Sequence, residues 1–352
     1  MSGSADAPDS IEPLARAWLA LDVGGAHLKA AHSLAGPRTV PFEVWRRPGE
    51  LGAAIAALAS SFPPFDAVAL TMTAELCDCF ATKAEGVRAI LNAVDRAAGP
   101  RPVLVWGTDG RFHRPERIRR EPILAAAANW LALAAVAATS VPNERAILID
   151  IGSTTTDLIP LDRGKVVARG RTDTQRLRTG ELVYAGVRRT PVCALAAELS
   201  IGKSEPIGLA AELFATTLDV FLILGDLRPD EDDRATADGR PATAERARDR
   251  LARMLGADRE EFSTEEARAF AEAVERVLLD RLIQAARRVC EATIGRPEAA
   301  VISGSGEFLA RRVALVILGD DRPIHALADL WGEAASTAAC AQALLLLGSG
   351  ID

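Results

Sequence analysis

Three glycine-containing turns carry the residue types that phosphate chemistry needs. In the first, LALDVGGAHLKA, Asp22 ends an apolar stretch and is followed by Gly24, Gly25 and Lys29. Backbone N–H groups at glycines can come close to anionic oxygens, a lysine adds positive charge, and a carboxylate can hold Mg2+ through water. This turn therefore predicts a phosphate-binding loop that begins with a metal-binding carboxylate.

The second turn, LIDIGSTTTDLIPL, repeats this layout about one domain length further along the chain. Asp150 and Asp157 are its candidate metal ligands. Between them lie a glycine and hydroxyl side chains that suit phosphate oxygens, namely Gly152, Ser153, Thr154 and Thr155. The repeat predicts an internal duplication of one αβ unit.

The third turn, VISGSGEFLARRV, runs from a strand into a helix through Gly304, Ser305 and Gly306. A helix N-terminus attracts anions because its first backbone N–H groups have no partner within the helix. Taken alone, each turn is also typical of an ordinary strand connection, since glycine and aspartate are the commonest turn residues. Their order and spacing together favour a phosphate site with Mg2+ as its cofactor.

The elements that must position these turns follow an α/β pattern. In the first half, predicted strands alternate with predicted helices, the strands at 40–45, 67–72 and 102–106 and the helices at 49–61, 83–98 and 121–139. In the second half we predict strands at 146–151, 156–161, 165–170 and 299–303. A long helical region at about 190–290 is interrupted by RPDEDDRATADGRPAT, a charged segment that is either solvated or a lid over a site.

The length of 352 residues is that of about two domains. We predict a disordered tail at 1–15, a first domain at 16–142 and a second at 146–352 that carries the helical insertion. The net charge of −7 argues against nucleic acid and anionic lipid as partners. We expect a cytoplasmic protein, because no stretch resembles a membrane span or a signal peptide and the five scattered cysteines indicate reduced thiols. The oligomeric state stays open.

The three turns together resemble the nucleotide-binding loops of the actin, sugar kinase and heat-shock ATPase superfamily. This resemblance spans nearly the whole chain and implies two ribonuclease H-like domains around a central cleft. The sequence departs from the superfamily at Gly25 and Ala26, where a hydroxyl is common. The third turn also has fewer glycines than a typical adenosine motif. Both departures argue against ATP as the ligand.

Longer strings resemble a narrower family, namely TMTAELCDCFATKAEGV, WGTDGRF, AAANWLALA, RGRTDTQRLRTGELVYAGVRRTPVCALA and TADGRPAT. They look like the proteins of tetrahydromethanopterin-linked one-carbon transfer, whose archaeal relatives are the (furan-2-yl)methanamine synthases of methanofuran biosynthesis. The resemblance implies a transferase that joins an aminomethylfuran-methyl diphosphate to the phenol of a (glutamyl)tyramine or tyrosine unit. Diphosphate is released, so the resemblance implies that the turns hold this leaving group, with Mg2+ near Asp22 and Asp150.

The implied reaction needs a group that accepts the proton of a phenol, whose ordinary pKa is about 10. Glu75, Asp78 and Lys83 follow the predicted strand at 67–72, at the end where α/β sheets place ligands. They are the catalytic candidates. A solvated helix start is the alternative interpretation of the same three residues.

Substrate contacts are expected from RTDTQRLRTGELVYAG, because arginine forks suit a diphosphate or a carboxylate. The candidates there are Asp173, Arg176, Glu181 and the only tyrosine, Tyr184. Surface ion pairing is the alternative for these charges. Asn129 is a polar residue in an alanine-rich helix, and we expect it to contact either substrate or the backbone.

Two other functions remain open on the sequence. One is an ATP-dependent kinase or hydrolase of the same superfamily, which the hydroxyl-rich second turn fits equally well. The other is a nucleotide sensor or assembly protein that works by domain closure rather than chemistry. Binding of Mg2+ with diphosphate, compared with Mg2+ and ATP, separates these hypotheses.

Overall fold

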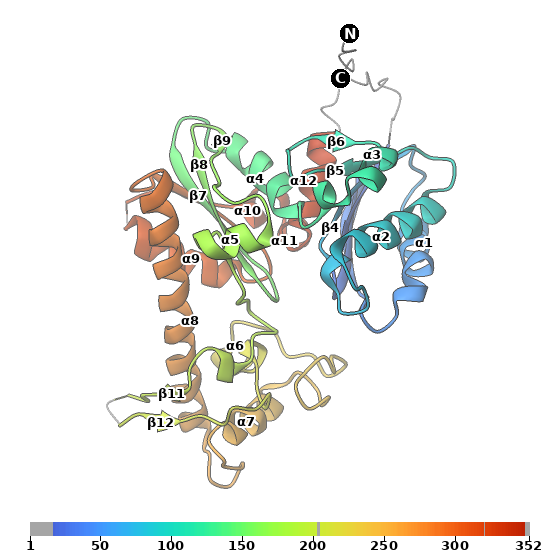
Figure 1. The fold of residues 1–352 in the computed structure, drawn as a ribbon. Coiled ribbons are helices and arrows are strands. Elements are labelled where there is room, and N and C mark those ends of the chain that lie inside the picture. Colours follow the sequence, from blue (N-terminus) through green and yellow to red (C-terminus); the bar gives the residue numbers. More distant parts are fainter. Residues whose placement is uncertain (1–16, 203–204, 320, 349–352) are drawn as a thin grey trace. The chain divides into compact units, whose positions relative to one another are not determined.

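The computed structural model describes residues 17–202, 205–319 and 321–348 (Figure 1). The predicted tail at 1–15 lies outside the described residues. Two compact units make up the chain: the first extends to Val136 and resumes at Glu333, and the second runs from Ala137 to Gly332. None of the helices in the described ranges combines the length and the apolar character needed to cross a membrane.

A six-stranded sheet forms the first unit, in the order β3-β2-β1-β4-β5-β6. Its strands are β1 (Trp18–Val23), β2 (His27–His32), β3 (Ala35–Pro41), β4 (Ala67–Met72), β5 (Val103–Trp106) and β6 (Phe112–His113). β1 pairs antiparallel with β2 and parallel with β4, and β4 is parallel to β5. Every residue of β4 is buried, as expected of a central strand covered on both faces.

Helices pack against this sheet. They are α1 (Leu51–Ser60), α2 (Lys83–Ala98), α3 (Pro115–Arg120), α11 (Glu333–Thr337) and α12 (Ala339–Gly348). Leu21 and Leu70 from the strands join Ile55 of α1 and Ile90 of α2 in one apolar cluster. α2 starts where Thr82 accepts a hydrogen bond from the backbone of Glu85, a typical N-cap.

The end of the chain differs from the predicted domain assignment. The sequence places everything up to residue 352 in the second domain, whereas α12 contacts β1, β2 and β4 and therefore belongs to the first unit. The physical reason is that α12 consists mainly of alanine and leucine, which are most stable against an apolar sheet. The boundary after Val136 falls inside α4 (Asn129–Thr139) rather than after residue 142.

The second unit contains a sheet in the order β10-β8-β7-β13-β14, with β9 paired to β8. Its strands are β7 (Arg145–Ile151), β8 (Thr156–Asp162), β9 (Lys165–Val166), β10 (Leu182–Val183), β13 (Ala299–Ser303) and β14 (Ile324–Ala326). β7 is antiparallel to β8 and parallel to β13, and β13 is parallel to β14.

The two sheets repeat one topology. In each, a central strand has an antiparallel hairpin partner on one side and two parallel strands on the other, as β2-β1-β4-β5 and as β8-β7-β13-β14. This order is that of a ribonuclease H-like domain. The predicted α/β class and the predicted duplication are therefore confirmed, and both aspartates that begin the repeated turns lie on the equivalent strands β1 and β7.

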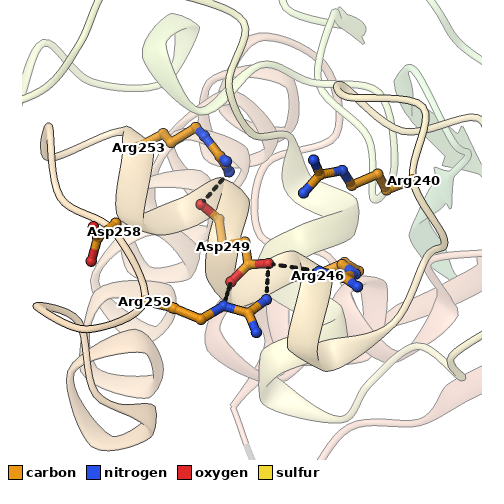
Figure 2. A pocket seen from close by; sticks show the side chains of 6 residues that line it. All are labelled: Arg240, Arg246, Asp249, Arg253, Asp258 and Arg259. Carbon is orange, nitrogen blue, oxygen red and sulfur yellow. Dashed lines mark hydrogen bonds and ion pairs between the residues drawn. The ribbon is translucent and has the colours of Figure 1, made fainter.

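The predicted helical insertion at about 190–290 is only partly helical. The helices of the second unit after β9 are α5 (Asp173–Thr179), α6 (Thr217–Leu224), α7 (Ala244–Arg253), α8 (Thr264–Thr293), α9 (Glu307–Leu318) and α10 (Leu327–Trp331). A two-stranded ribbon, β11 (Glu198–Leu199) with β12 (Ile207–Gly208), precedes α6. α7 and the loops beside it enclose a cavity lined by arginine and aspartate side chains (Figure 2).

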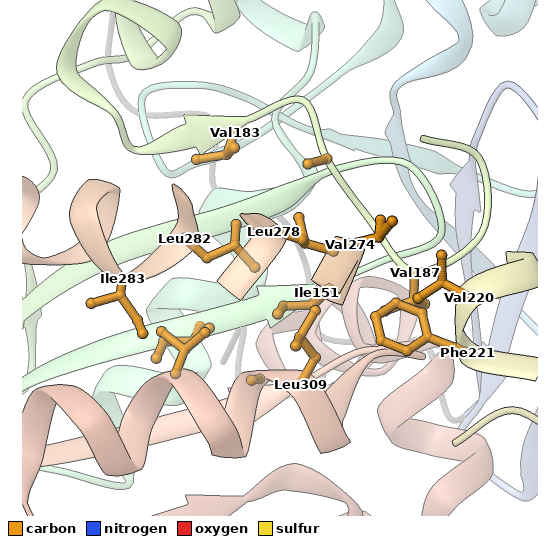
Figure 3. Close-up of a cluster of buried hydrophobic side chains, with 14 of the residues drawn as sticks. Ile151, Val183, Val187, Val220, Phe221, Val274, Leu278, Leu282, Ile283 and Leu309 are labelled. Carbon is orange, nitrogen blue, oxygen red and sulfur yellow. The ribbon is translucent and has the colours of Figure 1, made fainter. Parts of the chain in front are cut away.

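The core of the second unit lies where the sheet meets α8 and α9. Ile151 at the end of β7 and Leu278 of α8 belong to one cluster with Leu309 of α9 and Phe221 of α6 (Figure 3). Each of these four side chains is almost fully buried. Ile151 is the residue directly before Gly152, so close packing at this point fixes where the second predicted phosphate loop begins.

Candidate functional site

In the first unit, neighbouring strands place three polar side chains on one face of the sheet. Asp22 on β1 is directly opposite Lys29 on β2 and Thr71 on β4, and directly opposed residues share a face. Asp22 is 4% exposed and Thr71 is fully buried. Within the described part of the chain, Asp22 Oδ1 and Thr71 Oγ1 are both buried without a hydrogen-bond partner. Orphaned polar atoms of this kind are costly and point to a site that a ligand completes.

The environment of Asp22 controls its charge. Burial raises the pKa of this carboxyl above its ordinary value, and the positive charge of Lys29 acts in the opposite direction. The ionised form is therefore disfavoured until a further positive charge arrives. A carboxylate in this state suits a role beside a cation.

The first predicted loop, residues 24–26, is fixed by backbone hydrogen bonds to neighbouring segments. Gly24 N donates to His27 O at 3.0 Å, and Val44 N donates to Gly25 O at 2.9 Å. A Cβ at Gly25 would lie 3.1 Å from the sulfur of Cys77, so this residue must stay small. The loop is a tight hairpin connection whose backbone is fixed at the end of β1.

The three catalytic candidates have different surroundings. Glu75 is buried in the 3-10 helix η2 (Ala74–Leu76), directly after β4. A Cβ at Gly86 of α2 would lie 2.6 Å from the Cα of Glu75, so the two backbones touch here. Asp78 is exposed, and Lys83 is the half-buried first residue of α2. Only Glu75 is therefore shielded from water as a tuned proton acceptor requires.

In the second unit, the strands bring Asp150, Asp157 and Ser303 to one face. Asp157 on β8 and Ser303 on β13 are both directly opposite Asp150 on β7. Ser303 Oγ donates to Asp150 Oδ1 at 2.6 Å. Asp157 forms an ion pair with Arg176 of α5, whose side chain is 2% exposed. The two carboxylates therefore have different partners: Asp150 accepts a hydrogen bond from a neutral hydroxyl, whereas Asp157 is paired with a positively charged guanidinium.

The second and third predicted loops meet at the end of β7. Gly152 N donates to Thr155 O at 2.9 Å and closes the hairpin, while Gly306 N donates to Ile151 O at 2.8 Å. Gly304 has a φ of +91°, and a Cβ there would lie 2.7 Å from Asp150 Oδ1. Only glycine permits this approach. Residues 152–155 and 304–306 thus lie side by side at the end of β7, next to Asp150, and we call this group of residues the phosphate surface.

The segment around Gly186, which the sequence marked by its family resemblance and as a source of substrate contacts, supports this surface. Val187 N donates to Gly152 O at 3.1 Å, and Arg188 N donates to Ser153 O at 3.0 Å. A Cβ at Gly186 would lie 2.6 Å from both Ser153 C and Thr154 N. The family string that contains YAGVRR drew attention to this segment, but it gives no information on which distant residues Gly186 contacts.

Most of the predicted substrate contacts are already engaged by the protein. Glu181 accepts hydrogen bonds from Arg169 N at 2.6 Å and Gly170 N at 2.7 Å, and it orders the loop before α5. Asn129 Oδ1 accepts from Trp130 N at 2.8 Å at the start of α4, which is the backbone alternative. Tyr184 is 57% exposed. Asp173 is the first residue of α5, 4.0 Å from Arg176.

The residues fit a magnesium ion in part. No group of three or more His, Cys, Asp or Glu side chains gathers as a metal site in the described ranges. Mg2+ nevertheless is usually held by one or two carboxylates together with waters and phosphate oxygens. Asp22, with its orphaned oxygen, and Asp150 suit that role. The charge of Asp157 is already offset by Arg176.

Comparison with known proteins gave matches along most of the chain. The sequence pattern of the hydantoinase/oxoprolinase family matches residues 66–345. The (4-{4-[2-(gamma-L-glutamylamino)ethyl]phenoxymethyl}furan-2-yl)methanamine synthase of Methanocaldococcus jannaschii is 36% identical over 266 residues, which cover 74% of this chain and 78% of that protein. The synthase of the same name from Methanococcus vannielii is 33% identical over 149 residues, covering 42% of this chain and 66% of that protein.

A solved structure is also similar. The activator of the 2-hydroxyisocaproyl-CoA dehydratase from Clostridium difficile with bound ADPNP aligns with a TM-score of 0.44 and 11% sequence identity. The alignment covers 94% of this chain and 96% of that one.

Proposed function

The chain belongs to the hydantoinase/oxoprolinase family. From its similarity to the archaeal synthases, we propose that it is a synthase that forms an aryl ether in methanofuran or methylofuran biosynthesis. The single observation that carries this proposal is the identity of 36% over 74% of the chain to a synthase of a phenoxymethylfuran amine. The product name of that synthase contains an ether between a phenol oxygen and a furanylmethyl carbon.

The reaction is a substitution at the furanylmethyl carbon. The bond between this carbon and the oxygen of a diphosphate breaks, with both electrons leaving on the diphosphate, and the phenol oxygen forms the new C–O bond. The furan ring stabilises positive charge on the methylene group, so bond breaking runs ahead of bond making. The phenol proton passes to a base on the protein.

The phosphate surface, residues 152–155 and 304–306, is the proposed binding place of the diphosphate leaving group. Backbone N–H groups and hydroxyls, ordered before the substrate arrives, stabilise charge that grows as a bond breaks. Lys29, on the same sheet face as Asp22, adds positive charge. Mg2+ bound at either of the two aspartates, Asp22 or Asp150, would supply further positive charge to the departing diphosphate. That these two carboxylates share one site stays a prediction.

Glu75 is the proposed proton acceptor. It is the buried member of the three candidates and directly follows β4, the strand that pairs with the strand of Asp22. Burial keeps water away from this carboxylate, so it can take the proton directly from the phenol. The scattered cysteines support the further proposal that the protein acts in the reducing cytoplasm.

The test is a reconstitution with purified protein, a furanylmethyl diphosphate, glutamyl-tyramine, tyramine or tyrosine, and Mg2+, in the absence of ATP. We expect ether formation by mass spectrometry with one diphosphate released per ether. Diphosphate should compete with the furan substrate. Strict dependence of the ether on ATP hydrolysis would instead favour the kinase-like alternative.

A further inference from the structure

A cavity of about 320 Å³ in the second unit has no part in the proposed reaction. We call it the arginine pocket, after the side chains that line it: Arg240, Arg246, Asp249, Arg253, Asp258 and Arg259. They lie on α7 and on the loops directly before and after it (Figure 2). None of them was a predicted phosphate, metal or substrate contact.

The carboxylate of Asp249 binds two of the four guanidiniums, those of Arg246 and Arg259. Asp249 is buried, accepts from Arg246 at 3.3 Å and from Arg259 Nε at 3.0 Å, and makes a second, shorter bond to Arg259. Burial alone would raise the pKa of Asp249, but its bonds to Arg259 and Arg246 bring it below the ordinary value. Asp249 therefore stays ionised and holds these two arginines in place.

Arg240 and Arg253 have no such partner. Arg253 Nη1 donates to the backbone oxygen of Asp249 at 2.9 Å, and no carboxylate of the described chain forms an ion pair with either guanidinium. Figure 2 shows both side chains directed toward the same space, one from α7 and one from the preceding loop. Asp258 also lines the pocket, and its Oδ1 accepts from Glu260 N at 2.8 Å.

This charge distribution calls for a negatively charged ligand. The lining has four guanidiniums against two carboxylates, and Glu245 at the start of α7 also pairs with Arg259 at 3.0 Å. Positive charge is therefore in excess by about one unit, and it is concentrated on Arg240 and Arg253, which have no ion-pair partner among the described residues. Guanidinium forks bind carboxylate and phosphate oxygens through paired hydrogen bonds. A dianion between Arg240 and Arg253 would remove the repulsion between them and satisfy donors on both sides.

The pocket is also tied to the proposed phosphate surface. Arg240 lies in the charged loop at 226–243, where Asp233 forms an ion pair with Arg188. The backbone of Arg188 in turn donates to Ser153 O at 3.0 Å. On the other side, Asp238 pairs with the fully buried Arg250 at 3.0 Å. The loop is therefore held by ion pairs at Asp233 and at Asp238, and the second lies two residues before Arg240.

We propose that the arginine pocket binds a small dianion, a phosphate or a dicarboxylate, between Arg240 and Arg253. Binding at this place does not depend on the proposed ether-forming activity. It is a second anion site of the chain, built from residues other than those that hold the leaving group.

Calorimetry on the full chain at low ionic strength tests the proposal, with inorganic phosphate and succinate as the two probes. We expect a dissociation constant of about 1 mM or tighter for at least one probe. The double variant Arg240→Gln, Arg253→Gln should weaken that binding at least about tenfold, since each charge-assisted pair contributes about that factor. The stronger of the two probes identifies the chemistry of the ligand.

The matched control is Arg268→Gln, an exposed arginine of α8 that pairs with Glu272 outside the pocket. It removes one positive charge from an exposed position of the same unit and should leave binding unchanged. Arg246 and Arg259 are kept, because their loss would strand the buried Asp249. The proposal is overturned if neither probe binds, if the double variant binds as tightly as the parent chain, or if the control loses binding equally.

Discussion

Gly186 offers the sharpest test of how the phosphate surface is held in place. A Cβ at this position would lie 2.6 Å from Thr154 N and from Ser153 C, while ordinary van der Waals contact begins at 3.4 Å. The nearest atom, Gly152 O, would lie at 2.4 Å, so Gly186→Ala has to push the 152–155 loop away by about 1.0 Å. The backbone angle of Gly186 is not in the left-handed region, so the added methyl group acts through the contact alone.

The expected cost is larger for catalysis than for folding. Misplacement of a ligand by about 1 Å lowers rates by about a hundredfold, and overpacking in a tight interior costs about 1–3 kcal/mol of unfolding free energy. We therefore expect kcat/KM for ether formation to fall about a hundredfold while the variant still melts cooperatively.

Steady-state assays of diphosphate release, with thermal melting of the same samples, measure both effects. Gly208→Ala is the matched control, because this exposed glycine of the second unit has nothing within 4 Å of an added Cβ. Near-parental activity of a folded Gly186→Ala protein would refute the assignment of residues 152–155 as a ligand-holding loop.

Three further predictions follow from the buried polar groups. Asp22→Asn should lower ether formation at least about a hundredfold. Because burial raises the pKa of Asp22 in the folded protein, the wild-type carboxyl stabilises the fold in acid, where it is protonated, and destabilises it above the folded pKa, where it is ionised. The variant should therefore have a higher melting temperature than the wild type at pH 7, and this difference should disappear in acid. Arg176→Gln should cost about 3–5 kcal/mol in urea unfolding, since it strands Asp157, and an unchanged midpoint would contradict this. Cys290, whose pKa burial raises to about 12, should resist iodoacetamide at pH 8 until urea is added, as peptide mass spectrometry can establish.

The sequence predicted elements well where local pattern and tertiary environment agree. The strand predicted at 67–72 coincides with β4, and the strand at 156–161 lacks only the last residue of β8. The strand predicted at 40–45 is wrong, because β3 runs from Ala35 to Pro41. Pro37 is tolerated within this strand because β3 lies at the sheet edge, where a proline costs no ladder hydrogen bond.

Long-range contacts limited what could be predicted of the site. The turns at Asp22 and Asp150 were visible because each is a local strand, aspartate and glycine pattern. The contact between Gly304 and Asp150, and the support of Ser153 by Gly186, depend on residues far apart in sequence. No spacing rule reports that Arg176 is buried against Asp157, which is why it looked like a surface charge or a substrate contact.

The place of α12 in the first unit has a consequence for the order in which the protein takes shape during synthesis. The helix that contacts β1, β2 and β4 leaves the ribosome only after every residue of the second unit. The second unit can therefore close its core while the first sheet still lacks one of its covering helices. Until α12 arrives, the nascent first sheet presents apolar strand surface to water, and this is the interval in which the chain is most prone to aggregate.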